Sequence, residues 1–381
     1  MSQNLARSLI RQWEAEMNAH NTAGLAGLYS DEAVLTSPMF KTTRGRNAIA
    51  VTFDLLFARF PDWKVEMSNI LIDGDQVVAL AVAAATDRFG GFGLSATGEP
   101  FSYRCVLLYT VRDGKIVCEE RIYDLTAVID RLEKVRVERE LRAASDVQRA
   151  LFPRATQLGD YYEASGDSIP CRAIGGDFFD FFLLSECRFG LTLGDVSGKG
   201  PAAALLASLI QGMFAVEARR WQGPARALSQ INEALIRRGI EPRFATLSCA
   251  TVTKDGNLTY ANAGHNPPLL VTEEGIRRLV AGGPMLGLFA DATFAEETVR
   301  LRPGALLIVF SDGVTDAGKG ENEEFGEDRL RECVEANYKL TPAELVASTL
   351  DAVREFSGGA VHSDDATLVA LRYVGPPLPP D

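Results

Sequence analysis

The chain has 381 residues, of which 46% are hydrophobic and 24% are charged. This length predicts two domains, because ordinary domains contain about 100–200 residues, and the composition excludes a disordered or fibrous chain. The formal net charge of −12 is uneven: residues 1–150 carry 18 basic and 20 acidic residues, and the remainder carries 21 and 31. Phosphates repel such a chain, so we expect no general binding to nucleic acid or anionic membrane. The acidic second part suggests carboxylates gathered for a purpose such as metal binding.

Residues 1–125 predict an α+β domain. Apolar residues recur at three- and four-residue intervals from Leu5 to Met17 and again at about 46–59, which is the period of an amphipathic helix. Strand-like runs follow at 63–71, 76–86, 101–112 and 115–123, with the hairpin signals Asp73-Gly74 and Asp113-Gly114 between two pairs of them. This order predicts helices that cover a curved antiparallel sheet.

Residues 126–153 predict one long charged linker helix, which Pro153 ends. Two sets of apolar residues follow the spacing of a coiled coil, and the register slips between them. The first seam is Leu125, Val128, Leu132 and Val135, and the second seam is Val137, Leu141, Ala144 and Val147 or Leu151. Two interpretations stay open here: a short dimeric coiled coil, and a helix packed on its own chain.

Residues 154–375 predict a mostly antiparallel sandwich with helices outside. Strand-like runs dominate and do not alternate one for one with helical runs, which argues against a doubly wound parallel sheet. The proline-rich tail, 376–381, is predicted to be disordered. No apolar run reaches the ~18 residues of a membrane span, and no signal-peptide pattern is present, so we expect a cytoplasmic protein without a membrane partner.

Four acidic motifs at strand ends carry the predicted chemistry of this second part. They read GGDFFD at 175–180, GDVSGKG at 194–200, SDGVTD at 311–316 and SDDATLV at 363–369. Converging carboxylates repel one another, and divalent cations relieve that repulsion. Oxygen ligands without histidine or cysteine favour Mg²⁺ or Mn²⁺. Two such ions ~3.5–4 Å apart can hold a hydroxide and orient a phosphate for in-line attack.

In this order the motifs resemble those of the SpoIIE/RsbU-type branch of the metal-dependent protein phosphatases, the PPM superfamily, as do NAGHNPP at 262–268 and VQRALFP at 147–153. The resemblance covers about residues 140–374 and implies an α-β-β-α sandwich that hydrolyses phosphoserine or phosphothreonine with a metal-bound water. It implies a phosphorylated STAS-type anti-anti-sigma factor as substrate, in bacterial partner switching. It also implies two Mn²⁺ or Mg²⁺ ions, with Asp195 bridging both and the remaining ligands supplied by Asp177, the Val196 carbonyl, Asp312 and Asp364.

For five residues in or near these motifs, two interpretations of the side chain's role stay open. Asp180, Asp316 and Asp365 either orient the metal ligands or lie in solvated turns. His265 is either a general acid or, as we favour, a histidine that hydrogen-bonds its own turn. Lys199 either meets substrate phosphate or is an ordinary surface lysine.

Residues 1–125 also resemble the SnoaL-like cone fold, through the opening helix, DEAV at 31–34, RGRNAI at 44–49, DGKI at 113–116 and YDL at 123–125. Some members use a His/Asp pair as acid and base, and Asp124 matches the acid position, but this chain has no histidine between His20 and His265. We therefore expect a sensor that binds a small-molecule ligand or dimerises, and that controls the phosphatase of a homodimer. The alternatives are a catalytically weak signalling scaffold, and a SnoaL-type isomerase or cyclase fused to a phosphatase.

Overall fold

The structure is a computed structural model that describes residues 3–90, 94–239, 243–318, 323–358 and 364–375. It forms two compact units, residues 1–140 and 141–381, which we call the N-unit and the C-unit. The α+β class predicted from the sequence is confirmed. The finer domain boundaries at residues 125 and 153 stay a prediction, and the predicted disordered tail lies outside the described residues.

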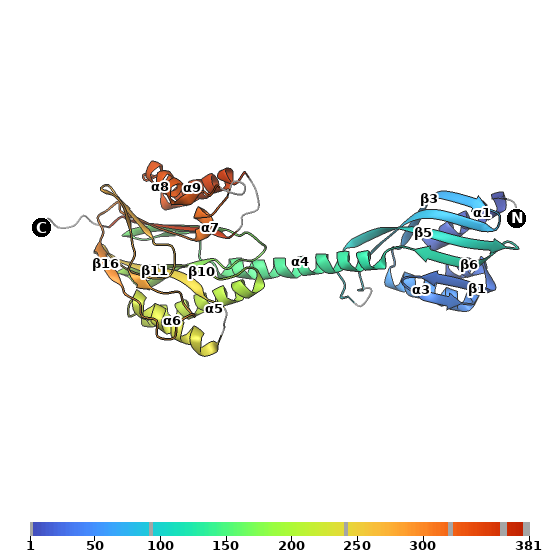
Figure 1. Ribbon diagram of the computed structural model, residues 1–381, viewed down its shortest axis with the longest axis horizontal. Helices are drawn as coiled ribbons and strands as arrows, with labels where there is room; N and C mark the ends of the chain where they lie inside the picture. The colour runs from blue at the N-terminus through green and yellow to red at the C-terminus, as the bar shows by residue number, and fades with distance from the viewer. Residues whose placement is uncertain (1–2, 91–93, 240–242, 319–322, 359–363, 376–381) are drawn as a thin grey trace. The chain divides into compact units, whose positions relative to one another are not determined.

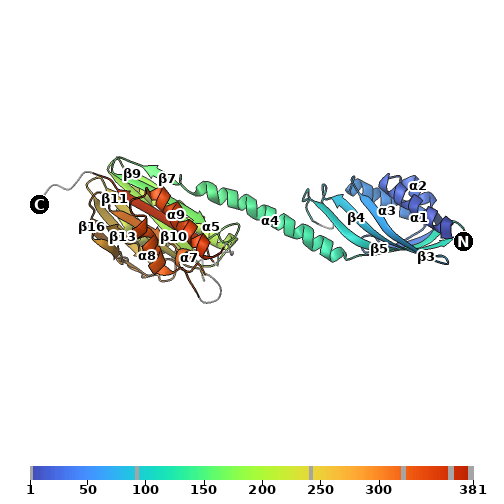
Figure 2. The same ribbon diagram turned by 90° about the horizontal axis from the view of Figure 1, so that it is seen from above.

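In the N-unit, helices cover one face of a six-stranded sheet (Figure 2). The helices are α1 (Gln3–Asn18), α2 (Thr22–Gly27) and α3 (Arg46–Arg59). The strands, in spatial order, are β2 (Lys41–Arg44), β1 (Tyr29–Ser37), β6 (Lys115–Ile122), β5 (Pro100–Arg112), β4 (Gln76–Thr86) and β3 (Lys64–Asp73). The sequence pattern does not predict β1 and β2, because the burial of β1 alternates irregularly. The expectation of a purely antiparallel sheet is wrong for one pair, since β1 runs parallel to β6.

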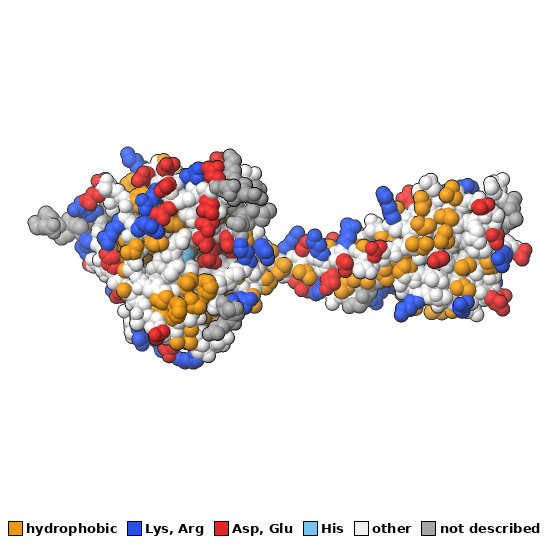
Figure 3. All heavy atoms as spheres, in the orientation of Figure 1, with side chains coloured by type: hydrophobic (Ala, Val, Ile, Leu, Met, Phe, Trp, Pro, Cys, Tyr) orange, Lys and Arg blue, Asp and Glu red, His pale blue; other side chains and the backbone are white. Residues whose placement is uncertain are grey.

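The two faces of this sheet differ in what covers them. Along β4, Val77 and Ala79 point into the core with α1 and α3, whereas Leu80 and Val82 alternate onto the opposite face. We call that opposite surface the outer sheet face. Figure 3 shows apolar side chains gathered over the sheet of this unit. The strand registers place these residues on the outer sheet face: Leu71, Val78, Leu80, Val82, Val106, Leu108 and Ile122.

Helix α4 (Leu125–Leu151) begins in the N-unit and ends in the C-unit. Val128 and Leu132 of the first seam are 6% and 2% exposed and belong to the N-unit core. Arg139 also donates a hydrogen bond to the Thr97 carbonyl of the same unit. For the first seam the coiled-coil interpretation is therefore wrong, because its central residues already pack on their own chain. In the second seam, Val147 remains 64% exposed.

The C-unit is a sandwich in which two sheets lie between two pairs of helices (Figure 1). One sheet contains β15 (Gly282–Gly283), β12 (Asn257–Ala263), β11 (Ala245–Thr253), β10 (Arg188–Val196) and β9 (Phe178–Ser185), with β16 (Glu297–Arg300) beside β12. The other contains β14 (Gly275–Arg278), β13 (Leu269–Thr272), β17 (Leu306–Phe310), β18 (Ala366–Tyr373), β8 (Tyr162–Ile169) and β7 (Thr156–Leu158). The helices are α5 (Pro201–Glu217), α6 (Pro224–Arg238), α8 (Gly326–Ala336) and α9 (Pro342–Phe356), with the 3₁₀ turn η1 (Ala218–Arg220) and the one-turn helix α7 (Asp312–Thr315).

Three cores hold these layers together. Phe179, Leu191 and Val309 fill the space between the sheets. Helices α5 and α6 pack their apolar sides on the first sheet, and α8 and α9 pack on the second. The predicted α-β-β-α sandwich is thereby confirmed, and all its strand pairs are antiparallel except β12 with β15.

One helix corrects the expectation that no segment is long and apolar enough for a membrane span. Residues 201–220, which comprise α5 and η1, meet that criterion by length and composition. The described structure uses this helix differently, since Ala203, Ile210 and Phe214 are buried against α6 and the first sheet. The core therefore accounts for part of its apolar composition, whereas Leu205 and Val216 are 73% and 61% exposed.

Candidate metal centre

The four motif aspartates stand at one end of the C-unit sandwich. Asp177 directly precedes β9 and Asp195 is the penultimate residue of β10; these strands are antiparallel neighbours, with Phe178 opposite Gly194. Asp312 lies two residues after β17 and Asp364 two residues before β18, and these two strands are likewise antiparallel neighbours. Figure 3 shows acidic side chains gathered over α7 and the nearby strand ends.

Asp177 connects the two sheets. Its side chain is buried, and Thr367 of β18 donates a hydrogen bond to Asp177 Oδ2 over 2.6 Å. A β-carbon on the preceding residue, Gly176, would lie 2.6 Å from the Val196 carbonyl oxygen and 3.3 Å from Asp195 Oδ1. Glycine at 176 thus lets the loop approach β10 closely, and it brings Asp177, Asp195 and the Val196 carbonyl together as the resemblance implies.

The carboxylates of this cluster resist being charged together. Burial, followed by Asp312, Asp364 and Asp365, raises the pKa of Asp195 to about 7. Burial and Asp195 raise the pKa of Asp177 well above its ordinary value. Burial, Asp316 and Asp364 raise the pKa of Asp312. A cluster of carboxylates that disfavour one another's charge fits hard divalent cations, which would remove the repulsion.

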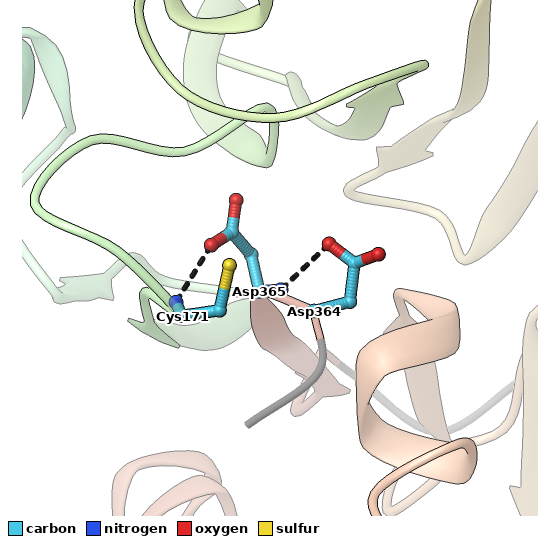
Figure 4. Close-up of side chains that lie close together, drawn as sticks. All are labelled: Cys171, Asp364 and Asp365. Atoms are coloured by element: carbon cyan, nitrogen blue, oxygen red, sulfur yellow. Dashed lines mark hydrogen bonds between the residues drawn. The ribbon is translucent and has the colours of Figure 1, made fainter. Parts of the chain in front are cut away.

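Asp365 holds the loop that leads to Asp177. It is 4% exposed, and its carboxylate accepts hydrogen bonds from the backbone N–H groups of Cys171 and Gly176, both over 2.8 Å, and of Asp177 over 3.4 Å. The structure therefore favours an orienting role for Asp365 over a solvated turn. Figure 4 shows this carboxylate above the Cys171 backbone nitrogen.

Cys171 is a neighbour of the cluster that sequence reasoning missed. Its Sγ and a carboxylate oxygen from each of Asp364 and Asp365 all lie within 4.8 Å of one another. Burial and Asp365 raise the pKa of this thiol to about 12, so it is protonated at neutral pH. No sequence pattern links Cys171 to Asp365, because the contact joins residues 194 positions apart.

The structure gives Lys199 a partner that neither sequence interpretation included. Its ammonium group lies 3.0 Å from Asp364 Oδ2, and both side chains are partly exposed. Hydrogen bonding to Asp364 raises the pKa of Lys199. A lysine thus neutralises one of the predicted metal ligands.

Asp180 and Asp316 stand apart from the cluster in different ways. Asp180 lies within β9, where it accepts the N–H of Phe181 and interacts with Gln211 of α5, so the solvated-turn interpretation is wrong for it. Asp316 is exposed just after α7 and accepts a hydrogen bond from Thr315. It lies close enough to Asp312 to raise the pKa of that carboxyl.

His265 has the environment of a structural histidine. Its Nδ1 lies 2.8 Å from Thr246 Oγ1, and its backbone N–H donates to Asn262 Oδ1 over 2.6 Å. Burial lowers its pKa to about 4, so the ring is neutral at physiological pH. A neutral imidazole is a poor general acid, so a structural role is favoured over acid catalysis. The expectation that the ring bonds its own turn is wrong, because its partner Thr246 lies in β11. The other histidine near the motifs, His362, lies outside the described residues.

The N-unit contains a different buried polar cluster. Arg121 Nε donates to Glu119 Oε1 over 2.6 Å, and Glu119 also accepts the hydroxyl of Tyr29. Trp13 in turn donates to the Tyr29 oxygen over 2.7 Å. Asp124, in contrast, is exposed and accepts the N–H of Ala127 at the start of α4. It therefore caps a helix, which argues against a catalytic acid at this position.

Comparison with known families assigns a type to each unit. Residues 185–374 match the family described as "Stage II sporulation protein E (SpoIIE)". Residues 10–119 match the family described as "SnoaL-like domain". Protein IcfG of Synechocystis is 28% identical over 61% of this chain and 41% of its own length. Phosphoserine phosphatase RsbU of Bacillus subtilis is 27% identical over 62% of this chain and 70% of its own length.

A solved structure supports the fold of the C-unit. The SiaA-PP2C domain of Pseudomonas aeruginosa is 22% identical and matches 63% of this chain and 98% of its own length with a TM-score of 0.57. This likeness shows the PP2C fold, and the family match places the acidic motifs at 194–200, 311–316 and 363–369 within its bounds. The chain therefore carries a SnoaL-like domain followed by a SpoIIE-type, PP2C-like phosphatase domain.

Proposed function

We propose that this protein is a metal-dependent phosphoserine/phosphothreonine protein phosphatase. The observation that carries the proposal is the meeting of four motif aspartates at one end of two sheets, with Asp177 joined to Thr367 across the sandwich. Two divalent cations, Mn²⁺ or Mg²⁺, would supply charge compensation and activation of the attacking water. The kinship with phosphoserine phosphatase RsbU supports the same reaction.

The chain's own residues divide between the two ions. Asp177 and the Val196 carbonyl would hold one ion, Asp312 and Asp364 would hold the other, and Asp195 would be a ligand of both. Asp365 would keep the Asp177 loop in place through its three backbone contacts. Lys199 would have to share Asp364 with a cation or release it, because its ammonium group now occupies one carboxylate oxygen.

A metal-dependence assay tests this proposal. The full chain is freed of metal with EDTA and given a phosphorylated protein together with Mn²⁺, Mg²⁺ or Zn²⁺. We expect hydrolysis to vanish with EDTA and to return with Mn²⁺ or Mg²⁺ but not with Zn²⁺, because the donor set contains only oxygen. Full activity in metal-free buffer would exclude the proposed mechanism.

For the substrate we propose a phosphorylated STAS-domain protein, an anti-anti-sigma factor in a cytoplasmic partner-switching pathway. The kinship of the phosphatase domain with RsbU supports this choice. Phosphorylated STAS proteins from the source organism should be dephosphorylated at least tenfold faster than an unrelated phosphoserine peptide. Equal rates for both would remove the substrate proposal and leave the phosphatase proposal intact.

For the N-unit we propose a regulatory role with a homodimer formed through the outer sheet face. The strand registers align Leu80, Val106 and Ile122 in one row, and Val78 with Leu108 in the next. Contiguous apolar surface of this kind marks an interaction site, and a standard interface needs about 800 Å² per partner. Val82→Asp should convert dimers to monomers in light scattering, whereas Thr86→Asp at the end of the same strand should not.

A small-molecule ligand inside the N-unit is part of the same proposal. Among the described residues, Arg121 Nη2 and the Tyr109 hydroxyl are buried without a hydrogen-bond partner. Both groups donate hydrogen bonds, so a ligand with a carboxylate or carbonyl oxygen would satisfy them. Thermal-shift screening of small carboxylic acids against wild type and Tyr109→Phe tests this idea.

A further inference from the structure

The last turns of α4 hold the loop that carries Asp177 through one side chain. Gln148 Nε2 donates to the Gly175 carbonyl over 2.8 Å, and the Gly175 N–H donates back to Gln148 Oε1 over 3.2 Å. One amide side chain thus satisfies both backbone polar groups of a residue two positions before Asp177. Such a paired contact fixes the direction of the loop as well as its distance from the helix.

The loop at Gly175 and Gly176 is hydrogen-bonded by Gln148 and by Asp365. The Asp365 carboxylate accepts the N–H of Gly176, the neighbour of Gly175. A methyl group at Gly175 would overlap the Asp365 carboxylate, so the backbone there has no room to move toward Asp365. A cleft of about 340 Å³ lies beside this loop and is lined by Gln148, Gly175, Asp177 and Asp365. Gln148 and Asp365 are therefore the two side chains that hold the loop beside this cleft.

The end of α4 is itself anchored by contacts that do not involve the loop. Gln211 of α5 donates to the Leu151 carbonyl over 2.8 Å. Phe152 stacks on Phe179 of β9 with ring centroids 5.3 Å apart. The contacts with α5 and β9 thus fix the end of α4, which carries Gln148. The hydrogen bonds of Gln148 in turn fix Gly175 relative to this helix end.

We propose that Gln148 is a positioning residue for the metal centre: it fixes Gly175 and thereby the Asp177 carboxylate, so that metal affinity depends on how the end of α4 is seated. This inference rests on the proposed function, because it takes Asp177 to be a metal ligand. Gln148 touches neither substrate nor metal in this scheme. Its removal should weaken metal binding and leave turnover at saturating metal nearly unchanged.

The test is a calorimetric titration of the metal-free full chain with MnCl₂. Gln148→Met keeps the length of the side chain and removes both hydrogen bonds. We expect its Mn²⁺ affinity to fall about tenfold, which corresponds to about 1.4 kcal/mol and is in the range expected for two lost hydrogen bonds. The metal-free protein should also melt a few degrees lower, because it loses the same two hydrogen bonds, and turnover at saturating Mn²⁺ should stay within about threefold of wild type. The matched control is Gln157→Met, which removes one local hydrogen bond to the Arg154 carbonyl and should change the affinity less than twofold.

The outcomes separate this inference from the proposed function. A wild-type chain that binds no Mn²⁺ contradicts the proposed function itself. A wild-type chain that binds Mn²⁺ together with a folded Gln148→Met variant of equal affinity overturns only the positioning role. If Gln148→Met does not fold, Gln148→Asn carries the test, because its amide is one methylene too short to reach both groups of Gly175. Equal affinity in that variant overturns the inference in the same way.

Discussion

Each unit of this protein buries carboxylates, and the two units deal with the charge differently. In the N-unit, Glu119 is fully buried but receives Arg121 from the same strand at 2.6 Å. In the C-unit, Asp177 and Asp195 receive other carboxylates as neighbours, and the lysine nearby pairs with Asp364 at the edge of the cluster. A buried carboxylate with its own cation belongs to the fold, whereas partly buried carboxylates that face one another have the charge of an ion-binding site.

The largest effect that distinguishes the two units is expected when charge is removed from the carboxylate cluster of the C-unit. Asp195→Asn should lower phosphatase turnover by more than 1,000-fold, because one side chain serves both proposed ions. The metal-free variant should melt at the same temperature as wild type or higher, because the repulsion within the cluster falls. Steady-state kinetics and calorimetry measure the two effects. Near-wild-type turnover in a folded variant would rule out the two-ion assignment.

The corresponding change in the N-unit should damage stability instead of chemistry. Arg121→Met leaves Glu119 buried without its cation, which costs about 3–5 kcal/mol of unfolding free energy. Adding Glu119→Gln to this variant should restore part of the loss. Urea unfolding of the full chain gives both values. As a control, Arg136→Met removes an exposed pair with Glu140 on α4 and should cost less than about 1 kcal/mol.

The pH dependence of the metal-free protein sharpens the same comparison. The pKa of Asp195 lies at about 7 in the folded chain, above its ordinary value of 3.8. The folded state therefore binds the proton of the Asp195 carboxyl more tightly than the unfolded state does. The protonated carboxyl contributes its full stabilisation below about pH 4, and this stabilisation is lost as the pH rises to about 7.

Melting curves in EDTA at pH 5 and pH 8 measure this effect. His265 acts in the opposite direction, because its pKa is lowered to about 4 and its burial favours the folded state more as the pH rises. The difference between wild type and Asp195→Asn isolates Asp195: wild type should lose more stability between pH 5 and 8 than the variant. Parallel pH profiles would contradict the charge coupling.

The smallest expected effect concerns the helix that the two units share. Leu132 is buried in the N-unit, whereas Leu141 of the second seam is only half-buried. Leu132→Asp should therefore destabilise the N-unit by about 2–4 kcal/mol. Leu141→Asp should leave stability nearly unchanged and alter turnover or its dependence on protein concentration by about two- to fivefold. If Leu141→Asp matches wild type in turnover and in light scattering, the second seam has no regulatory role.

Local patterns predicted the parts of this fold that local forces determine. The strands next to Asp195 and Asp312 are continuous apolar runs, and the acidic motifs directly adjoin them, so the convergence of carboxylates followed from the strand ends. Strand β1 escaped notice because its burial alternates irregularly and its parallel partner β6 lies about 85 residues away.

What the sequence did not reveal are contacts between distant residues. Val128 and Leu132 have the spacing of a coiled coil, and only the structure shows that the N-unit core already covers them. The Gln148–Gly175 pair, the Cys171–Asp365 contact and the Lys199–Asp364 ion pair join segments between 27 and 194 residues apart. Short-range periodicity carries no information about such pairs, because each partner looks like an ordinary polar residue in its own segment.

The most direct test of the central claim is anomalous scattering from crystals of the full chain grown with Mn²⁺. We predict two anomalous peaks about 3.5–4 Å apart, both within bonding distance of Asp195, with Asp177 and the Val196 carbonyl on one and Asp312 and Asp364 on the other. Density from the same measurement on Asp195→Asn should show neither peak at full occupancy. Manganese bound elsewhere, or an unchanged pair of peaks in the variant, would contradict the assignment of this cluster as the metal centre.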